Sequence, residues 1–308
     1  MMLSKSKLKR YKKLAGEKCD DGYKEFPCDL CRSTEAIKVP YASRYTKGQD
    51  IHICKNCGFV YVKKRRSYDR IAQVWSKELF GKAYTAKSPL MLARHSYVAE
   101  FIDQNLSLKN KKICDVGAGE GQFLNLIKKN YRASVFGIEP SSVNCKLMRS
   151  EGIKYFQGTL QDYLESFKHK QYRADIVTIM WTLENATSCN DLLLGAREIL
   201  KDNGFLVVAT GSRLLVPFSK PLYLYLSSNP ADTHPARFSF NTLISFLNRT
   251  GFKVICANHY LNDSLALCVI AKKCKINKAA RIKGDDFREV RDFFKRWHRE
   301  TLFHRENQ

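Results

Sequence analysis

The sequence predicts an α/β fold in which a mostly parallel sheet carries helices on both faces. From Lys112 onward, short apolar runs alternate with amphipathic segments whose apolar residues recur with a helical period. Such regular alternation favours crossover connections and therefore parallel strands. Three amphipathic segments are also followed by a glycine that would end a helix, at Gly152, Gly204 and Gly251.

The predicted strands are seven apolar runs, most of them separated by a helical segment. These runs span residues 112–119, 133–140, 153–158, 174–181, 204–211, 252–259 and 264–271. The predicted helices between them span residues 122–130, 143–152, 189–200 and 241–251. Only a short turn separates the last two runs, so we expect the final strand to pair antiparallel.

Four segments of different character divide the chain. We expect a flexible basic tail over residues 1–18, a cysteine-bearing module over 19–70, the α/β domain over 71–274 and a basic C-terminal segment over 275–308. Helical periodicity predicts one more helix before the sheet, from about Ser88 to Leu106, and a basic amphipathic helix over 285–304.

Composition narrows the classes of function. The 308 residues are 44% hydrophobic and 27% charged, which excludes a collagen-like or wholly disordered chain. The formal net charge of +23 predicts attraction to phosphorylated metabolites, nucleic acid or acidic membranes; a solvated lysine-rich surface is the alternative. No apolar run approaches the roughly 20 residues of a membrane span, and no apolar segment follows the basic N-terminus. We therefore expect a cytoplasmic protein.

Four of the eleven cysteines have the spacing of a metal site. Cys28 and Cys31 form one Cys-x-x-Cys pair, and Cys54 and Cys57 form a second. Two such pairs suit one tetrahedral zinc ion, and four thiolates leave no position open for a reacting molecule. We therefore predict a zinc-ribbon-like module with a structural zinc ion; four incidental cysteines in a small module are the alternative.

A glycine-rich turn follows the first predicted strand and opens a helix. Its glycines are Gly117, Gly119 and Gly121, whereas a nicotinamide fingerprint would place its third glycine where Gln122 stands. Glu139 closes the next strand, 20 positions after Gly119, where a carboxylate accepts hydrogen bonds from ribose hydroxyls. The turn therefore predicts a nucleoside-containing cofactor, with an ordinary strand–helix turn as the alternative.

These motifs resemble those of the class I S-adenosylmethionine-dependent methyltransferases, whose fold is Rossmann-like. The resemblance covers about residues 85–273 and rests on DVGAGEGQF, GIEPS, ADIVTIMWTLEN and LKDNGFLVVAT. The cysteine quartet with ICKNCGFVYV, and the later segment DTHPARFSFNTLISFLNRTGF, are similar to zinc-containing methyltransferases that include sugar C-methyltransferases.

The resemblance implies roles for eight residues around the methyl donor. The three glycines would let the backbone approach its methionine half, Asp115 would face its amino group, and Glu139 would hold its ribose. Thr159 and Leu160 would lie beside the adenine, and the backbone of Trp181 would approach the amino group. The implied cofactor-binding residues are Asp115, Gly117, Gly119, Gly121, Glu139, Thr159, Leu160 and Trp181.

Methyl transfer also needs a base, and the sequence offers two candidates where substrate should enter. His234 lies in the loop after the predicted fifth strand, and Glu184 follows the fourth. Arg213 and Arg237 are candidates for gripping a phosphate. The alternatives are a local hydrogen bond for His234, a helix-start carboxylate for Glu184 and ordinary surface charge for the arginines.

The leading functional prediction is methyl transfer to a small anionic acceptor, a nucleotide-linked sugar of polysaccharide or glycoside synthesis. Thr233 stands where sugar C-methyltransferases commonly carry Glu, and Asn185 where many relatives carry His, so the acceptor atom stays open among carbon, oxygen and nitrogen. The strongest rival is a zinc-containing RNA methyltransferase, which the basic charge favours. Against it, the fourth strand ends in MWTLEN, without the Asn/Asp-Pro-Pro-aromatic turn of enzymes that methylate base amino groups. A non-catalytic zinc scaffold is the third alternative.

Overall fold

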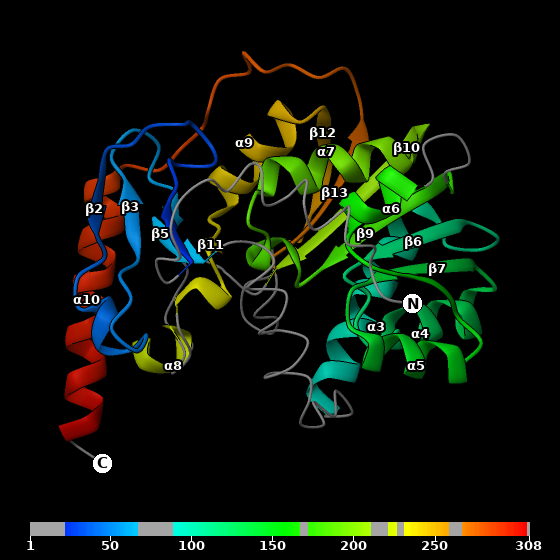
Figure 1. The fold of residues 1–308 in the computed structure, drawn as a ribbon, viewed down its shortest axis with the longest axis horizontal. Coiled ribbons are helices and arrows are strands. Elements are labelled where there is room, and N and C mark those ends of the chain that lie inside the picture. Colours follow the sequence, from blue (N-terminus) through cyan, green and yellow to red (C-terminus); the bar gives the residue numbers. More distant parts are fainter. Residues whose placement is uncertain are drawn as a thin grey trace.

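The computed structural model describes residues 22–66, 89–166, 172–210, 221–226, 231–258 and 267–306. The predicted basic tail lies outside these residues. Figure 1 shows a large sheet with helices on both faces at one side of the molecule, and a smaller strand-rich module with a long helix at the other. Within the described ranges, no helix is long and apolar enough to cross a membrane.

The large sheet has the strand order β12-β13-β10-β9-β6-β7-β8. Its strands are β6 (Lys112–Val116), β7 (Ser134–Glu139), β8 (Lys154–Gln157), β9 (Ala174–Met180), β10 (Leu200–Thr210), β12 (Phe252–Ala257) and β13 (Leu267–Lys273). Neighbours from β8 to β10 are parallel, whereas β13 is antiparallel to both β10 and β12. The predicted fold class, with its antiparallel last strand, is confirmed.

Two groups of helices cover the two faces of this sheet (Figure 1). One face carries α3 (Pro89–Leu106), α4 (Gln122–Tyr131) and α5 (Ser142–Ser150), and the other carries α6 (Leu160–Ser166), α7 (Cys189–Ile199) and α9 (Phe240–Arg249). Successive residues of a strand point to opposite faces, so each strand feeds both cores. In β9, Ile176 packs on the α3 side, whereas Val177 and Ile179 pack on the α7 side.

The three glycines predicted to end helices differ in the structure. Gly152 (φ 62°) and Gly251 (φ 84°) follow α5 and α9 in the left-handed conformation that ends many helices. Gly204 instead lies inside β10, because α7 ends at Ile199 and the strand begins at the next residue. The prediction that Gly204 stops a helix is therefore wrong.

The N-terminal module contains a small antiparallel sheet that a strand from far along the chain completes. Its strands are β2 (Ala36–Lys38), β3 (His52–Cys54), β4 (Val60–Tyr61) and β11 (Ala236–Arg237), in the order β11-β4-β3-β2. A second pair joins β1 (Tyr23–Glu25) to β5 (Lys64–Arg66). Because β11 pairs with β4, the sheet of the module includes residues from the segment predicted as the α/β domain.

The C-terminal helix α10 (Phe287–Glu306) packs on this module together with the short helix α8 (Leu222–Leu226). Val290, Phe294 and Trp297 of α10 enter a core shared with β3 and β4. The predicted C-terminal helix is therefore present with slightly shifted bounds, and one of its faces is buried.

Candidate functional site

The glycine-rich loop joins β6 to α4 at the carboxyl edge of the sheet. Gly117, Gly119 and Gly121 all have positive φ, of 75°, 55° and 77°, which other residues rarely adopt. A Cβ added at Gly117 would collide with Thr182 and one at Gly121 with Met148, whereas one at Gly119 would meet no described atom within 4 Å. Gly119 therefore faces space through which a bound molecule can approach the backbone.

Glu139 ends β7 and ties the glycine loop to this strand. Its Oε2 accepts a hydrogen bond from the Gly119 N–H (2.9 Å), and its Oε1 accepts from the Ser141 N–H (2.9 Å) and from Asn144 Nδ2 (3.3 Å). Burial raises the pKa of the Glu139 carboxyl, although these hydrogen bonds oppose the rise. Oε2 retains a lone pair that a ligand hydroxyl can use.

Asp115, near the end of β6, is the second buried carboxyl at this edge. Thr178 Oγ1 donates a hydrogen bond to Asp115 Oδ1 over 2.6 Å. Burial raises the pKa of Asp115 to about 7, and the nearby Glu139 adds to the rise. Neither carboxyl has a cationic partner among the described residues, so a positively charged ligand group would be stabilised here.

The two residues predicted beside the adenine stand where β8 leads into α6. Thr159 donates to Asp162 Oδ2 through both its hydroxyl (2.8 Å) and its backbone N–H (3.0 Å), which fixes the first turn of α6. The Leu160 side chain is buried and packs against Gly195 of α7. Both side chains therefore have structural contacts within the chain.

Trp181, directly after β9, has a left-handed backbone with φ of 53°. Its N–H donates to Ala209 O in β10 (2.7 Å), and its carbonyl accepts from Asn185 Nδ2 (3.1 Å). Such a conformation costs a non-glycine residue on the order of 1–3 kcal/mol, and residues of this kind cluster at functional sites. The next residue, Thr182, reaches the glycine loop at Gly117.

The two predicted bases lie on segments that the structure brings together. Glu184 is buried in the short helix η3 (Leu183–Asn185) after β9, and β11 lies against η3. His234 is half-buried just before β11, and its Nδ1 lies 3.3 Å from Thr233 Oγ1. Both segments follow carboxyl ends of strands, where open α/β sheets bind their ligands.

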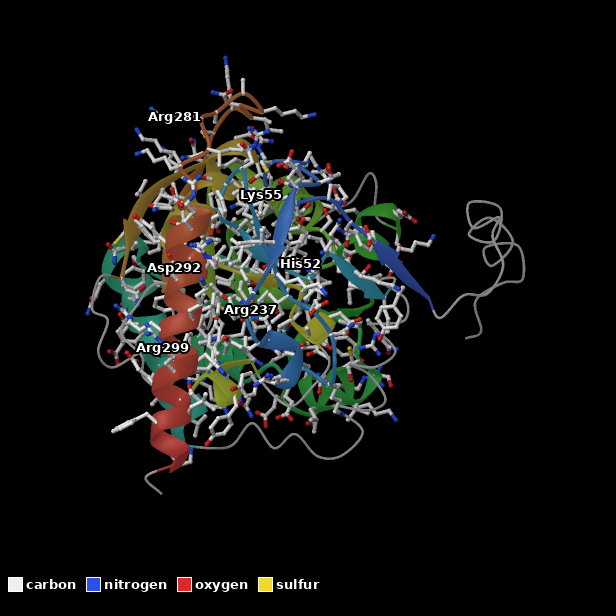
Figure 2. The ribbon with its side chains drawn as sticks, turned by 90° about the vertical axis from the view of Figure 1, so that its left-hand side faces the viewer. His52, Lys55, Arg237, Arg281, Asp292 and Arg299 are labelled. Carbon is white, nitrogen blue, oxygen red and sulfur yellow. The ribbon has the colours of Figure 1, made fainter. Side chains whose placement is uncertain are left out.

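Arg237 in β11 is a buried guanidinium, with 3% of its surface exposed. Its Nη1 donates to the His234 carbonyl (2.9 Å), and no carboxylate of the described residues forms an ion pair with it. Burial lowers the pKa of Arg237. Figure 2 labels it beside α10, amid the strands of the module. Arg213, the other predicted phosphate ligand, lies outside the described residues.

The four predicted zinc ligands converge in the module. Their Sγ atoms all lie within 4.8 Å of one another, with Cys28 and Cys57 at 3.6 Å and Cys31 and Cys54 at 3.5 Å. Zinc–sulfur bonds of about 2.3 Å in a tetrahedron place the sulfurs roughly 3.8 Å apart. All four are free thiols, so the donor set fits a zinc ion.

The sequence reasoning missed the contacts that join the module to the loop after β9. Asp29, inside the first cysteine pair, accepts from the N–H groups of Cys189 (2.5 Å) and Asn190 (3.4 Å) at the start of α7. Arg65 donates to the carbonyl of Thr187 (2.7 Å). Asp29 and Cys189 are 160 residues apart in the sequence, and Arg65 and Thr187 are 122 residues apart, so no local sequence pattern could reveal these contacts.

A second missed contact joins the module to the loop after β10. Arg66 donates from Nε to Asp232 Oδ2 (2.8 Å) and from Nη2 to Oδ1 (2.7 Å). Asp232 is fully buried in η4 (Ala231–Thr233), two residues before His234. Burial opposes ionisation, but the hydrogen bonds from Arg66 hold the pKa of Asp232 below its usual value. The module therefore holds both loops that carry predicted bases.

A Rossmann-like sheet, a glycine loop with one open face and an acidic residue ending the next strand together define a class I S-adenosylmethionine-dependent methyltransferase. The chain belongs to the methyltransferase-domain family, whose family model matches residues 92–257. S-adenosylmethionine is the methyl donor of this class.

Known proteins of this kind are similar to the chain over part of its length. The ubiquinone biosynthesis O-methyltransferase of Pasteurella multocida (strain Pm70) is 28% identical over 134 residues, which cover 40% of this chain and 54% of that protein. The chain thus spans about half the length of this curated relative.

The solved structures that share the fold include the following two. One is the 1,6-didemethyltoxoflavin-N1-methyltransferase of Burkholderia thailandensis, with a TM-score of 0.52, 12% identity and coverage of 72% of this chain and 98% of that one. The other is a candidate O-methyltransferase of Nostoc punctiforme PCC 73102, with a TM-score of 0.51, 20% identity and coverage of 65% and 60%.

Proposed function

We propose that the chain transfers the methyl group of S-adenosylmethionine to an oxygen of a small anionic acceptor, and that this acceptor is a nucleotide-linked sugar of polysaccharide or glycoside synthesis. Similarity to an enzyme named as an O-methyltransferase supports the oxygen. The resemblance of DTHPARFSF to the sugar methyltransferases supports the sugar. The evidence that the acceptor is anionic is Arg237, which is buried and has no carboxylate partner among the described residues.

A buried guanidinium such as Arg237 needs an opposite charge. Desolvation of an ion costs several kcal/mol, and a neutral carbonyl offsets only part of that cost. Among the described residues, Arg237 donates a hydrogen bond to the His234 carbonyl and interacts electrostatically with the Tyr225 phenol, but it has no carboxylate partner. The remaining donors of its planar fork match two phosphate oxygens, and Arg213 would add a second cation. A phosphate held by Arg237 would anchor the acceptor beside the loop that carries His234.

In this proposal, the methyl donor lies against the glycine loop. Gly119 leaves room for its methionine half, Asp115 faces its ammonium group, and Glu139 accepts from a ribose hydroxyl. The backbone of Trp181 and the start of α6, at Thr159 and Leu160, complete the contacts. The bound donor supplies an electrophilic methyl group, and the chain has to hold an acceptor oxygen in line with it.

We assign removal of the acceptor proton to His234, with Glu184 as the second candidate. An imidazole exchanges protons near neutral pH, which suits a general base. Donation from His234 Nδ1 to Thr233 Oγ1, 3.3 Å away, would orient the ring so that Nε2 takes the proton. Glu184 belongs to η3, against which β11 lies, so it stands on the same side of the sheet edge.

We propose that Cys28, Cys31, Cys54 and Cys57 hold a structural zinc ion. Four thiolates complete the tetrahedron, so the ion has no open position for catalysis. Its contribution would be to fix the two cysteine turns, and with them Asp29 at the start of α7.

An acceptor assay tests the proposal. Radiolabelled methyl donor is offered with a panel of nucleotide sugars, with the same sugars lacking phosphate, and with total RNA. We expect label in a nucleotide sugar, a fall in kcat of about 10²–10⁴ for His234→Ala, and a 10- to 100-fold rise, roughly, in acceptor KM for Arg237→Gln. Arg281→Gln is the control, because Figure 2 shows Arg281 at the top of the molecule, away from Arg237 near its middle.

One observation favours the RNA alternative. Four exposed cations follow β13, and none of them pairs with a described carboxylate: Lys275, Lys278, Arg281 and Lys283. RNA held by such charges would bind less tightly as salt rises, with log affinity falling linearly with log salt. Label in RNA alone, with a salt slope that Lys278→Gln reduces, would overturn the sugar proposal.

A further inference from the structure

His95 lies where two segments of the methyl-donor site meet. It belongs to α3, which packs against α4. The ring centroid of His95 is 5.9 Å from that of Phe123, two residues after Gly121, and 5.8 Å from that of Trp181, directly after β9. His95 therefore touches both segments to which the methionine half of the donor is assigned.

One ring nitrogen of His95, Nδ1, has no hydrogen-bond partner among the residues that the structure describes. The residue is 8% exposed, and its Nδ1 is buried without a hydrogen bond to any described residue. Burial, and secondarily the adjacent Arg94, lowers the pKa of His95 to about 4, so the ring is neutral at pH 7. A buried unsatisfied nitrogen destabilises a fold, and a phenylalanine would fill the same volume without that penalty.

We propose that His95 belongs to the methyl-donor site and donates a hydrogen bond from its imidazole to the carboxylate of the methionine half. The inference rests on the proposed placement of the donor against the glycine loop. Asp115 and Glu139 suit the ammonium and hydroxyl groups of the donor, but ionised carboxyls repel another carboxylate. His95 instead carries a nitrogen donor, and its ring contacts those of Phe123 and Trp181. Binding then supplies the partner that the buried ring lacks.

His95→Phe separates the effect of the imidazole nitrogens from that of ring packing, because it removes the nitrogens but preserves the aromatic contacts. We expect the dissociation constant of S-adenosylhomocysteine, measured by calorimetry, to rise about 10- to 100-fold, as for the loss of a charged hydrogen bond. The ligand-free variant should melt at the wild-type temperature or higher, because an unsatisfied nitrogen has gone. Tyr97→Phe, on the same helix but stacked on Phe101, is the control and should leave the affinity unchanged.

A second probe tests which part of the ligand His95 contacts. 5′-Methylthioadenosine has the adenosine and sulfur of the donor but lacks the amino-acid group. Wild type and His95→Phe should bind it equally. Equal weakening for both probes would overturn the carboxylate assignment.

The possible failures are separable. Wild-type binding of S-adenosylhomocysteine with unchanged affinity in His95→Phe would overturn this inference and leave the proposed function standing. Absence of binding to the wild type would overturn the placement of the methyl donor itself, on which the inference depends. A lower melting temperature with unchanged affinity would mean that His95 only packs.

Discussion

At the scale of single residues, one glycine turn serves two purposes. A Cβ at Gly119 would meet no described atom within 4 Å, which leaves room for the methyl donor in the proposed site, whereas a Cβ at Gly121 would meet Met148 at 2.5 Å and Ile153 at 2.9 Å. The first position leaves room for a ligand, and the second leaves room for the core between α4 and α5. Both have positive φ, so backbone strain alone does not distinguish them.

Replacing each glycine by alanine separates these purposes. Gly119→Ala should weaken S-adenosylhomocysteine binding at least tenfold and lower the free energy of unfolding by about 1–2 kcal/mol, the cost of a left-handed alanine. Gly121→Ala carries the same backbone cost and overpacks the core, so its unfolding free energy should fall by roughly 2–5 kcal/mol. Calorimetry and urea unfolding measure the two effects. A Gly119→Ala protein with wild-type affinity would contradict the open-face argument.

The pKa of about 7 at Asp115 predicts a pH-dependent stability. The folded-state pKa lies above the ordinary value of 3.8, so the folded state holds its proton more tightly than the unfolded state. The burial cost of the charge is therefore absent below about pH 4 and grows as pH rises towards 7. Asp115→Asn removes this cost and should unfold at higher urea than wild type at pH 8, by on the order of 2 kcal/mol.

Urea unfolding of both proteins from pH 4 to pH 8 checks this prediction. The difference between them should widen with pH, since other titrating groups cancel in the comparison. Asp115→Asn should also bind S-adenosylhomocysteine more weakly than the wild type, because Asp115 faces the ammonium group in the proposed site. Parallel stability curves for the two proteins would show that Asp115 has no raised pKa.

At the scale of elements, the module contacts the α/β domain at two loops that belong to the proposed acceptor site. These are residues 183–190 and 231–237, which we call the acceptor loops. Asp29 accepts from the first N–H groups of α7, and Arg66 donates three hydrogen bonds to Asp232, two from its guanidinium and one from its backbone N–H. Pairing of β11 with β4 adds a strand connection. The acceptor loops thus follow strands of the large sheet, but contacts with the N-terminal module hold them in place.

Asp29 should stabilise the fold because it accepts hydrogen bonds at the start of α7. Asp29→Ala removes the acceptor of two helix N-terminal N–H groups and should lower the free energy of unfolding by about 1–2 kcal/mol; Asp29→Asn should lower it less, because an amide oxygen still accepts. Asp50→Asn is the control, since its ion pair joins a half-buried Asp50 to an exposed Lys38 at the surface, and surface pairs contribute little. Equal effects of Asp29→Ala and Asp50→Asn in urea unfolding would contradict the capping role.

At the scale of the whole molecule, the carboxyl edge of the large sheet has two parts. One is held by the sheet and its own loops, and the other is held by the N-terminal module. The proposed methyl-donor side, with Gly119, Asp115 and Glu139, is held by hydrogen bonds within β6, β7, β9 and the loops that follow β6 and β7. The acceptor loops depend on the module, whose cysteine quartet supplies the position of Asp29. A substitution in the cysteine quartet should therefore loosen the acceptor loops but leave the proposed methyl-donor side unchanged.

Metal removal tests this division. Purified protein should contain about one zinc per chain, and Cys54→Ser should lose it. Hydrogen exchange by mass spectrometry should then accelerate in the acceptor loops and in residues 22–66, but not in residues 112–144, and S-adenosylhomocysteine affinity should persist. Cys274→Ser, at an exposed cysteine outside the quartet, is the control. Wild-type protein that is free of metal and shows the same slow exchange would contradict the zinc proposal.

Local patterns in the sequence were enough to predict the sheet, the glycine loop and the cysteine quartet. Apolar periodicity determines which segments become strands and helices, and the spacing of Gly119 and Glu139 places them on adjacent strand ends. The pattern failed at Gly204, where a bulged start to β10 replaced the expected helix stop. That register shift depends on pairing with β9, which the local sequence does not encode.

Only the tertiary structure decided which surfaces meet. The sequence alone determined that His234 and Glu184 follow strand ends, but not that β11 leaves the α/β domain to pair with β4. Nor could it show that the His95 ring contacts both Phe123 and Trp181, with an Nδ1 that no described residue hydrogen-bonds. The physical reason is distance along the chain: these contacts join residues whose spacing carries no periodic signal, and their partners are selected by packing and hydrogen-bond satisfaction after the local elements have formed.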